Sequence, residues 1–412
     1  MQEHGEDAHV GRNGRRIVAA LTATKFGDRV VDVKTVLPWL LGSLGAPTVL
    51  IGLLVPVRES GSMLPQTALL PWVRSRPRRT PVWLLGAAGQ AVAVAAMALA
   101  ALTLEGVPAG IAVLLALVVF AGFRSLTSLT TKDVLGRTVE KGSRGQVTGT
   151  ATTVSGVVAI TVGLGLRALG ADAPTWAFAA LLGGAALMWV LAMVLFSRVD
   201  EPAGEHDEDV DTSAITDGLA LLRDDPAFRR FVVARTLLLV SALTPPYVIS
   251  LAQSTTGDSI AGVGPFIVAS GVAGFLGGRL WGGVADRASR VLIAGAAGAA
   301  SAVVVGFLLL DGTSFAQGAA FYVGAYFLLA LTHTAARVGR KTYVVDLGEG
   351  NDRTDYVAVS NTVIAVLLLV VGGITGALST FGPAVALAVL AGIGALGVPA
   401  ALSLPAVSAQ RG

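Results

Sequence analysis

Apolar residues along this 412-residue chain gather into long runs that short polar stretches separate. A helix of about 20 apolar residues crosses the hydrocarbon core of a bilayer, which is about 30 Å thick. The pattern therefore predicts an all-α integral membrane protein with twelve transmembrane helices. The predicted helices span 15–40, 46–72, 82–104, 108–134, 146–169, 175–197, 227–252, 259–284, 291–310, 315–338, 354–378 and 382–405.

One long hydrophilic stretch interrupts this pattern near the middle of the chain. It begins at Val199 and carries a dense acidic run from Asp200 to Asp211. Such a run cannot bury apolar surface, so it is typical of a flexible, solvated linker. A cation-binding or regulatory role for this run stays open as an alternative. The division predicts an N-terminal bundle (1–198), an acidic cytoplasmic linker (199–225) and a C-terminal bundle (226–412).

The two halves that flank the linker look related to each other. A shift of 209 residues superposes Lys132 on Lys341 and Arg124 on His333, and each half is predicted to hold six helices. Two pseudo-symmetric bundles around a shared midplane site are a recurring plan of transporters. We therefore expect two six-helix bundles.

Composition agrees with a membrane protein and excludes several classes. The chain is 53% hydrophobic and 14% charged, whereas a soluble protein carries about a quarter charged residues. It has no cysteine, so disulfides and thiolate metal sites are excluded. Neither a phosphate-binding Gly-Lys-Ser/Thr loop nor a Gly-x-Ser-x-Gly elbow is present. We expect no enzyme, no cofactor and no metal site.

Basic residues are distributed unequally between the two sides of the predicted membrane. Of 30 Lys and Arg, 22 fall in the N-tail, the alternate loops and the C-tail, whereas the opposite loops LEGVPAG, QSTTGDS, DGTSFAQ and STFGPA have none. This asymmetry predicts a multi-pass protein of the inner (plasma) membrane with both termini in the cytoplasm. The net charge of +3 follows this distribution, so we expect no nucleic-acid partner.

A family resemblance rests on the segment GGVADRASR, which follows the eighth predicted helix. This segment is similar to the cytoplasmic signature of the major facilitator superfamily, and the topology and repeat extend the resemblance to the whole chain. The resemblance implies alternating access between two bundles. It also implies a cytoplasmic gate at Gly282, Asp286, Arg287 and Arg290, where the acid pairs with helix ends and the arginines latch the inward face. The equivalent first-half loop, LLPWVRSRPRR, lacks the aspartate, so its arginines are either a latch or only topology determinants.

Ionisable residues inside the predicted helices are the main functional signal, because such groups are costly at membrane depth and are usually kept for a substrate or ion path. Basic residues outnumber acidic residues there, so an anionic ligand or a hydrated cavity must compensate the excess. The basic residues are Lys25, Arg29, Lys34, Arg58, Arg124, Arg235 and Arg279, and the acids are Asp28, Asp32 and Glu59.

Spacing on the first predicted helix places Lys25, Asp28, Arg29 and Asp32 within one arc of about 100°. Two readings follow: a self-paired structural stripe, or a cavity wall that holds ligand and protonatable carboxylates. Lys34 points the other way on a continuous helix, so we expect its side chain to snorkel to the membrane interface.

On the second helix, Glu59, Ser62 and Gln66 share a face and form a polar track. Burial raises the pKa of a carboxyl toward neutrality, so Glu59 is a candidate proton carrier, with static pairing to Arg58 or Arg29 as the alternative.

Three further candidates lie on other helices. Arg124 resembles the helix 4 arginine that couples protonation to substrate in proton-linked members of the family. His333 occupies the equivalent place in the second half, although a lone histidine is more often a hydrogen-bonded structural residue. Arg235 offers a planar fork that matches a carboxylate or phosphate.

These features predict a monomeric secondary active transporter that moves a small or medium organic anion with protons through the lipid bilayer. Proton coupling is expected at Asp28, Asp32 and Glu59. A proton-driven exporter of lipophilic compounds, or a non-transporting sensor or lipid translocator, stays open as an alternative. Substrate binding is expected at Lys25, Arg29, Arg58, Gln66, Arg124, Arg235 and His333.

Overall fold

The computed structural model describes residues 3–138, 160–166, 176–203, 222–256, 260–316, 318–347 and 352–407, together with positions 154, 157, 158 and 220. These residues are almost entirely helical and contain no strand. The helices of the first half are α1 (Glu3–Val30), α2 (Val36–Ser43), α3 (Thr48–Arg74), α4 (Thr80–Thr103), α5 (Gly106–Thr138) and α7 (Trp176–Phe196).

The second half is built from α-helices and three short 3-10 helices. The α-helices are α9 (Pro226–Leu237), α10 (Val240–Leu243), α11 (Pro245–Thr256), α12 (Gly264–Leu310), α13 (Ala319–Leu347), α14 (Asp352–Leu378) and α15 (Pro383–Leu402). The 3-10 helices are η1 (Ile260–Val263), η2 (Ser314–Ala316) and η3 (Ser379–Phe381).

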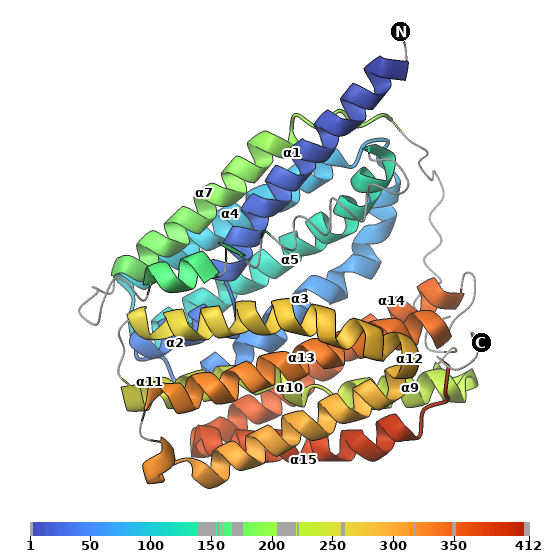
Figure 1. Cartoon of the computed structure of the whole chain (residues 1–412). Helices are drawn as coiled ribbons and strands as arrows, with labels where there is room; N and C mark the ends of the chain where they lie inside the picture. The colour runs from blue at the N-terminus through green and yellow to red at the C-terminus, as the bar shows by residue number, and fades with distance from the viewer. Residues whose placement is uncertain are drawn as a thin grey trace.

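Helices α1 to α7, coloured blue to green in Figure 1, pack together on one side of the molecule, and α9 to α15 pack on the other. The start of α1 and the end of α15 lie at the same end of the molecule. Within the described residues, eight helical stretches are long and apolar enough to span a membrane. The charged helices α1 and α3 are not among the eight, so the count of twelve spanning helices stays a prediction.

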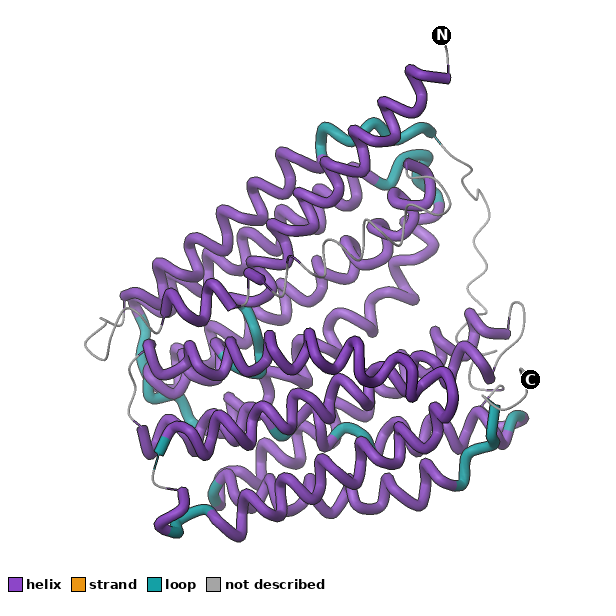
Figure 2. The backbone as a smooth tube through the Cα atoms, in the orientation of Figure 1, coloured by secondary structure: helices purple, strands orange, loops and turns teal. Residues whose placement is uncertain are grey.

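Two predicted helices are interrupted near the middle of the molecule (Figure 2). The segment predicted as one helix from 15 to 40 ends at Val30 and resumes at Val36. The Asp32 carboxylate lies in this break and accepts hydrogen bonds from the N–H of Lys34 (2.8 Å) and from the hydroxyl of Thr35 (3.0 Å). It satisfies donors that the broken helix leaves open.

The break in the second half divides the predicted helix 227–252 into α9, α10 and α11. Helix α11 begins at Pro245, whose ring is tolerated at a first helical position because the missing N–H has no intrahelical partner there. Discontinuous helices at membrane depth are typical where the freed backbone groups face protein or a cavity.

Helix α12 joins two predicted helices, 259–284 and 291–310, through a kink. The backbone of Ala288 is non-helical (φ −154°, ψ 61°), and the chain reverses direction there (Figure 1). The segment with the family signature is therefore a sharp bend within a helix pair and not an extended loop.

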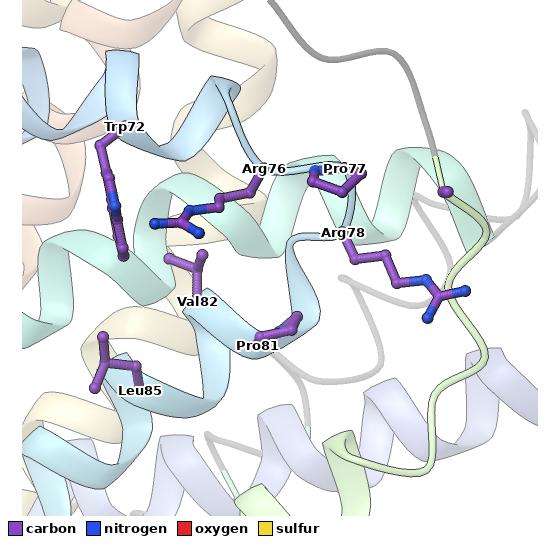
Figure 3. Close-up of a pocket in the computed structure, with 8 residues that line it drawn as sticks. Trp72, Arg76, Pro77, Arg78, Pro81, Val82 and Leu85 are labelled. Carbon is purple, nitrogen blue, oxygen red and sulfur yellow. The ribbon is translucent and has the colours of Figure 1, made fainter.

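The loop between α3 and α4 separates its arginines into two kinds. Arg79 turns inward, where its guanidinium donates to the backbone carbonyls of Val73 and Arg76 and lies 3.4 Å from the Asp133 carboxylate of α5. Arg76 and Arg78 stay exposed at the surface (Figure 3). Arg79 therefore stabilises the conformation of this loop, in addition to any effect that its charge has on membrane topology.

Acidic residues anchor both ends of the predicted linker, whose central part lies outside the described residues. The buried Glu201 carboxylate accepts hydrogen bonds from the N–H groups of Arg79 (2.9 Å) and Thr80 (2.7 Å), at the start of α4. It also lies 3.4 Å from Arg137. The linker is thus fixed to the first bundle where it leaves α7.

At the other end, Asp225 caps α9 by accepting from the N–H groups of Ala227 (2.8 Å) and Phe228 (3.0 Å). Partial burial opposes ionisation of this carboxyl. Hydrogen bonds from the Tyr356 hydroxyl and from the two N–H groups outweigh that effect and lower the pKa of Asp225 below its ordinary value.

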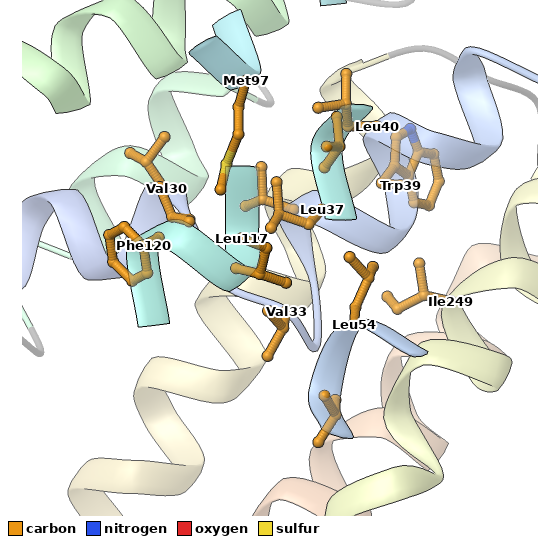
Figure 4. Close-up of a cluster of buried hydrophobic side chains, with 14 of the residues drawn as sticks. Val30, Val33, Leu37, Trp39, Leu40, Leu54, Met97, Leu117, Phe120 and Ile249 are labelled. Atoms are coloured by element: carbon orange, nitrogen blue, oxygen red, sulfur yellow. The ribbon is translucent and has the colours of Figure 1, made fainter. Parts of the chain in front are cut away.

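A buried apolar cluster crosses the boundary between the halves. Figure 4 shows Leu37, Leu54 and Phe120 of the first half with Ile249 of α11, all of them inaccessible or nearly so. Bonds between the halves lie close to this cluster. Gln253 of α11 donates to the Trp39 carbonyl (3.0 Å) of α2 and to the Ser43 hydroxyl (2.9 Å).

Helices α3 and α14 form the longest contact between the halves. The Ser60 hydroxyl donates to the carbonyl of Ala365 (2.7 Å). A Cβ on Gly372 would lie 2.0 Å from Cγ of Pro56, so only glycine permits this approach. The two halves are therefore closely packed at α2, α3, α11 and α14.

Candidate functional site

The centre of the site is an acid–base cluster built from three helices of the first half. The Asp28 carboxylate of α1 is held by both terminal nitrogens of Arg124 on α5, one of them at 3.2 Å, and lies 3.3 Å from Nη2 of Arg58 on α3. The side chains of Asp28, Arg58 and Arg124 are 15%, 11% and 31% exposed. All three side chains therefore stay partly exposed although they are paired.

This geometry decides between the two readings of the first helix for Asp28. A self-paired stripe would bind this carboxylate to Lys25 or Arg29 on its own helix. Its ion pairs instead run to α3 and α5, over 30 and 96 residues of sequence. The carboxylate therefore positions two arginines, whose combined charge it neutralises by only one unit.

Glu59 differs from Asp28 because its carboxylate forms no hydrogen bond or ion pair within the described part of the chain, although its backbone carbonyl accepts from the Ser62 hydroxyl. Its half-buried carboxylate interacts electrostatically with Lys34, Arg58, Arg124 and Arg340. The predicted static pairing with Arg58 is not formed, since Arg58 turns to Asp28. Proton transfer by Glu59 stays a prediction.

Asp32 has a structural role that the sequence did not indicate. Its Oδ1 accepts from the N–H of Lys34 and from the hydroxyl of Thr35 within the break between α1 and α2. This role positions the break, and participation of Asp32 in proton transfer stays a prediction.

The expectation that Lys34 snorkels to the membrane interface is wrong. Its ammonium lies 2.9 Å from Nε2 of His333 on α13, inside the molecule. The projection of Lys34 assumed a continuous helix, whereas α1 ends at Val30. The break redirects the side chain toward the other half.

The hydrogen bonds around His333 define the state of its ring. The Ser241 hydroxyl donates to the Leu238 carbonyl (3.0 Å), so its oxygen accepts from Nδ1–H of His333 (3.1 Å). Nε2 is then the acceptor for the Lys34 ammonium. This arrangement assigns a neutral imidazole that connects the two halves.

Two arginines of α13, Arg337 and Arg340, belong to the site but were assigned by their sequence position to the cytoplasmic side. Both interact electrostatically with Glu59, and Arg337 also interacts with Lys25 and Arg29. A signal for them existed in the sequence. They follow His333 by four and seven residues, which places all three on one helix face.

Arg235 lies apart from the acid–base cluster on α9. Its two terminal nitrogens donate to Ser360 Oγ and Asn361 Oδ1 of α14, both at 2.7 Å, and the residue is only 6% exposed. Its Nε has no hydrogen-bond partner in the described residues. The fork is therefore engaged in joining α9 to α14, and ligand binding by Arg235 stays a prediction.

The remaining predicted binding residues line the same region of the first half. Lys25 and Arg29 are half-buried and form no hydrogen bond within the described residues. Gln66 donates to the Ser62 carbonyl (2.7 Å) one turn earlier on α3. Their contact with a ligand stays a prediction.

The predicted gate lies at the kink of α12. Gly282 and the exposed Arg287 precede the kink, and Arg290 follows it and donates to the Leu404 carbonyl (3.1 Å) beyond α15. The side chain of Asp286 lies outside the described residues. Arg290 therefore fixes the bend to the end of the last helix, and the latch itself stays a prediction.

Charge is the overriding property of this site. Within the described residues it gathers seven cationic side chains and three carboxylates, and no group there has the ligands for a metal ion. The three carboxylates therefore leave four positive charges without a counter-charge among these residues. The charged residues are Lys25, Arg29, Lys34, Arg58, Arg124, Arg337 and Arg340 with Asp28, Asp32 and Glu59.

Comparison with known proteins identifies the fold. A family model described as Major Facilitator Superfamily matches residues 33–366. The structure is similar to that of the nucleoside transporter NupG (TM-score 0.73, 10% identity), covering 95% of this chain and 99% of that chain. It is also similar to the structure of a D-xylose-proton symporter (TM-score 0.69, 13% identity), with 96% of this chain and 98% of that chain covered.

A third similar structure is a POT family transporter in complex with a thioalcohol conjugated peptide (TM-score 0.67, 11% identity), with 93% of this chain and 94% of that chain covered. A search of curated proteins gives no significant match. The predicted all-α, major facilitator fold class is confirmed. The chain therefore belongs to the Major Facilitator Superfamily and is a multi-pass secondary transporter.

Proposed function

We propose that this transporter moves a small or medium organic anion together with protons. The observation that carries the proposal is the excess of cations over carboxylates in the site, because an uncompensated charge at membrane depth needs a partner. A carboxylate or phosphate on the substrate supplies that partner, and guanidinium groups match its planar geometry.

Asp28 and Glu59 have different roles in this proposal. Asp28 holds Arg58 and Arg124 in fixed orientations, so that their outer N–H groups are available to the substrate. Glu59 lies within the field of the same arginines and of Arg340, so its protonation changes how much positive charge the site presents. Substrate and proton then influence each other through Glu59, which is the physical basis of coupling.

Alternating access follows from the relation between the halves. Contacts at α2, α3, α11 and α14 hold them together, and the Lys34–His333 pair adds a polar contact between them. An anion that binds Arg124 of the first half and Arg340 of the second interacts with both bundles. It therefore favours rocking of the bundles about a central site.

The proposal includes the orientation of the chain. Both termini and the linker are placed in the cytoplasm of the inner (plasma) membrane, as the positive-inside distribution indicates. The bundle boundaries at 198 and 226 and a monomeric state belong to the same proposal.

The experiment uses Glu59→Gln in proteoliposomes, with an organic anion identified first by its thermal stabilisation of the purified protein. We expect Glu59→Gln to abolish uptake driven by a proton gradient and to spare exchange of labelled for unlabelled anion. The amide keeps the size of the side chain but cannot carry a proton.

Glu105→Gln is the matched control, since Glu105 is exposed between α4 and α5 and far from the cluster in sequence. It should keep both activities. Unchanged gradient-driven accumulation in Glu59→Gln would remove Glu59 from the coupling mechanism.

A further inference from the structure

A second site lies at the surface of the first half, where α3 ends and α4 begins. A cavity of about 530 Å³ opens there, and Trp72, Arg76, Arg78, Pro81, Val82 and Leu85 contribute to its lining (Figure 3). None of these residues belongs to the acid–base cluster around Asp28. The cavity therefore needs an explanation of its own.

Its charged residues have no acidic partner in the described part of the chain. Arg76 and Arg78 are exposed. The guanidinium carbon of Arg76 lies 5.1 Å from the centre of the Trp72 ring. The neighbouring Arg79 contrasts with them, because the loop carbonyls and Asp133 already use its guanidinium. The pocket thus presents two uncompensated cations.

The other walls are apolar and face the membrane edge. The candidate span of α4 begins at Thr80, so we expect Pro81 and Val82 close to where the membrane core starts. Leu85, one turn deeper, is 48% exposed. Tryptophan is enriched at this depth because its ring is apolar with one polar N–H. The pocket has a cationic outer part and an apolar inner part.

We propose that this pocket binds an anionic phospholipid of the adjacent leaflet. The phosphate pairs with Arg76 beside Trp72, and Arg78, which extends the other way along the loop, adds positive charge at the surface (Figure 3). The acyl chains follow Pro81 and the exposed Leu85 into the membrane. Basic pockets between helices at a membrane surface have the charge complementarity to hold acidic headgroups. A freely diffusing anion would gain nothing from the apolar wall.

The site touches the start of the linker. Ala203 also lines the cavity, and it follows Glu201, which caps α4. A bound lipid therefore contacts the loop, the first turn of α4 and the anchored end of the linker together.

The experiment measures binding of dioleoylphosphatidylglycerol and dioleoylphosphatidylcholine to the purified full-length protein by native mass spectrometry. We expect the first phosphatidylglycerol to bind more tightly than phosphatidylcholine. The double variant Arg76→Gln with Arg78→Gln should lower the affinity for phosphatidylglycerol by about five-fold for each arginine removed. Its affinity for phosphatidylcholine should stay unchanged.

The variant Arg229→Gln with Arg230→Gln is the matched control, because it removes two exposed arginines of α9 outside the pocket. Equal weakening in both double variants, or equal affinity for the two lipids, would overturn the proposal. Leu85→Trp narrows the apolar wall and keeps both arginines, so it should weaken the binding of phosphatidylglycerol without removing its preference over phosphatidylcholine; unchanged binding of phosphatidylglycerol would contradict the placement of the acyl chains. Full displacement of the lipid by inorganic phosphate would show a site for free anions instead.

Discussion

The two halves of the central site differ in how their charges are compensated. In the first half, Asp28 pairs with Arg58 and Arg124, and all three site carboxylates belong to this half. In the second half, the site residues His333, Arg337 and Arg340 contribute no acid, and Arg235 of the same half is bonded to the neutral side chains of Ser360 and Asn361. Among the described residues of the site, the first half supplies carboxylates that compensate part of its positive charge, and the second half supplies none.

Two halves with a similar helical arrangement can therefore carry different charged groups and have different roles in transport. Among the described residues, the first half contains all three site carboxylates, while Arg337 and Arg340 of the second half add positive charge that interacts with Glu59 of the first half. An anion between the halves would complete the compensation of the second half. We therefore infer that proton binding depends mainly on the first half and anion binding on both.

Removal of the Asp28 carboxylate should have the largest effect on stability. Asp28→Asn leaves Arg58 and Arg124 without their counter-charge, and the loss of one partner of a buried charge pair costs about 2–5 kcal/mol. Unfolding of the purified protein in detergent measures this loss. Asp32→Asn is the comparison, since it weakens only a local cap and should cost about 1 kcal/mol. Equal losses of unfolding free energy in the two variants would show that Asp28 does not hold the arginines of the cluster in place.

Arg235→Met should have a smaller effect, although the residue is more buried than Asp28. Its removal leaves Ser360 and Asn361 with lost hydrogen bonds but leaves no charge unpaired, and it relieves the desolvation of the guanidinium. We expect a loss below about 2 kcal/mol in the same unfolding measurement. A loss larger than that of Asp28→Asn would contradict the proposed difference between the halves.

The contact between the halves at Lys34 and His333 should give the smallest effect. A double-mutant cycle with Lys34→Met and His333→Leu should show a coupling of about 1–2 kcal/mol, as expected for a hydrogen bond from a charged donor. Additive effects of the two changes would indicate that the 2.9 Å contact does not stabilise this arrangement.

Much of the fold could be predicted because apolar length and basic asymmetry act locally along the chain. The positions of α4, α5, α7 and α15 follow directly from apolar runs. The placement of charged residues at depth on α1, α3 and α5 was also evident, and it identified the members of the Asp28 cluster before their contacts were known.

The partners within the cluster could not be predicted, since helical projection describes one helix at a time. Asp28 has closer neighbours in sequence than Arg124, and only the packing of α1 on α5 brings these two together. The projection of Lys34 also failed because Asp32 stabilises a break that periodicity does not show. The interaction of Arg337 and Arg340 with Glu59 was also not predicted, because a basic residue near a helix end looks the same in the sequence whether it only orients the chain or also faces a site.

Charge selectivity is the property that tests the central claim most directly. The measurement is the thermal stabilisation of the purified protein by pairs of compounds that share a carbon skeleton and differ only in a carboxylate or its neutral amide. We expect carboxylates to stabilise the protein and this effect to be lost in Arg124→Gln and in Arg340→Gln. Equal stabilisation by the neutral amides, or stabilisation by carboxylates that survives both substitutions, would contradict it.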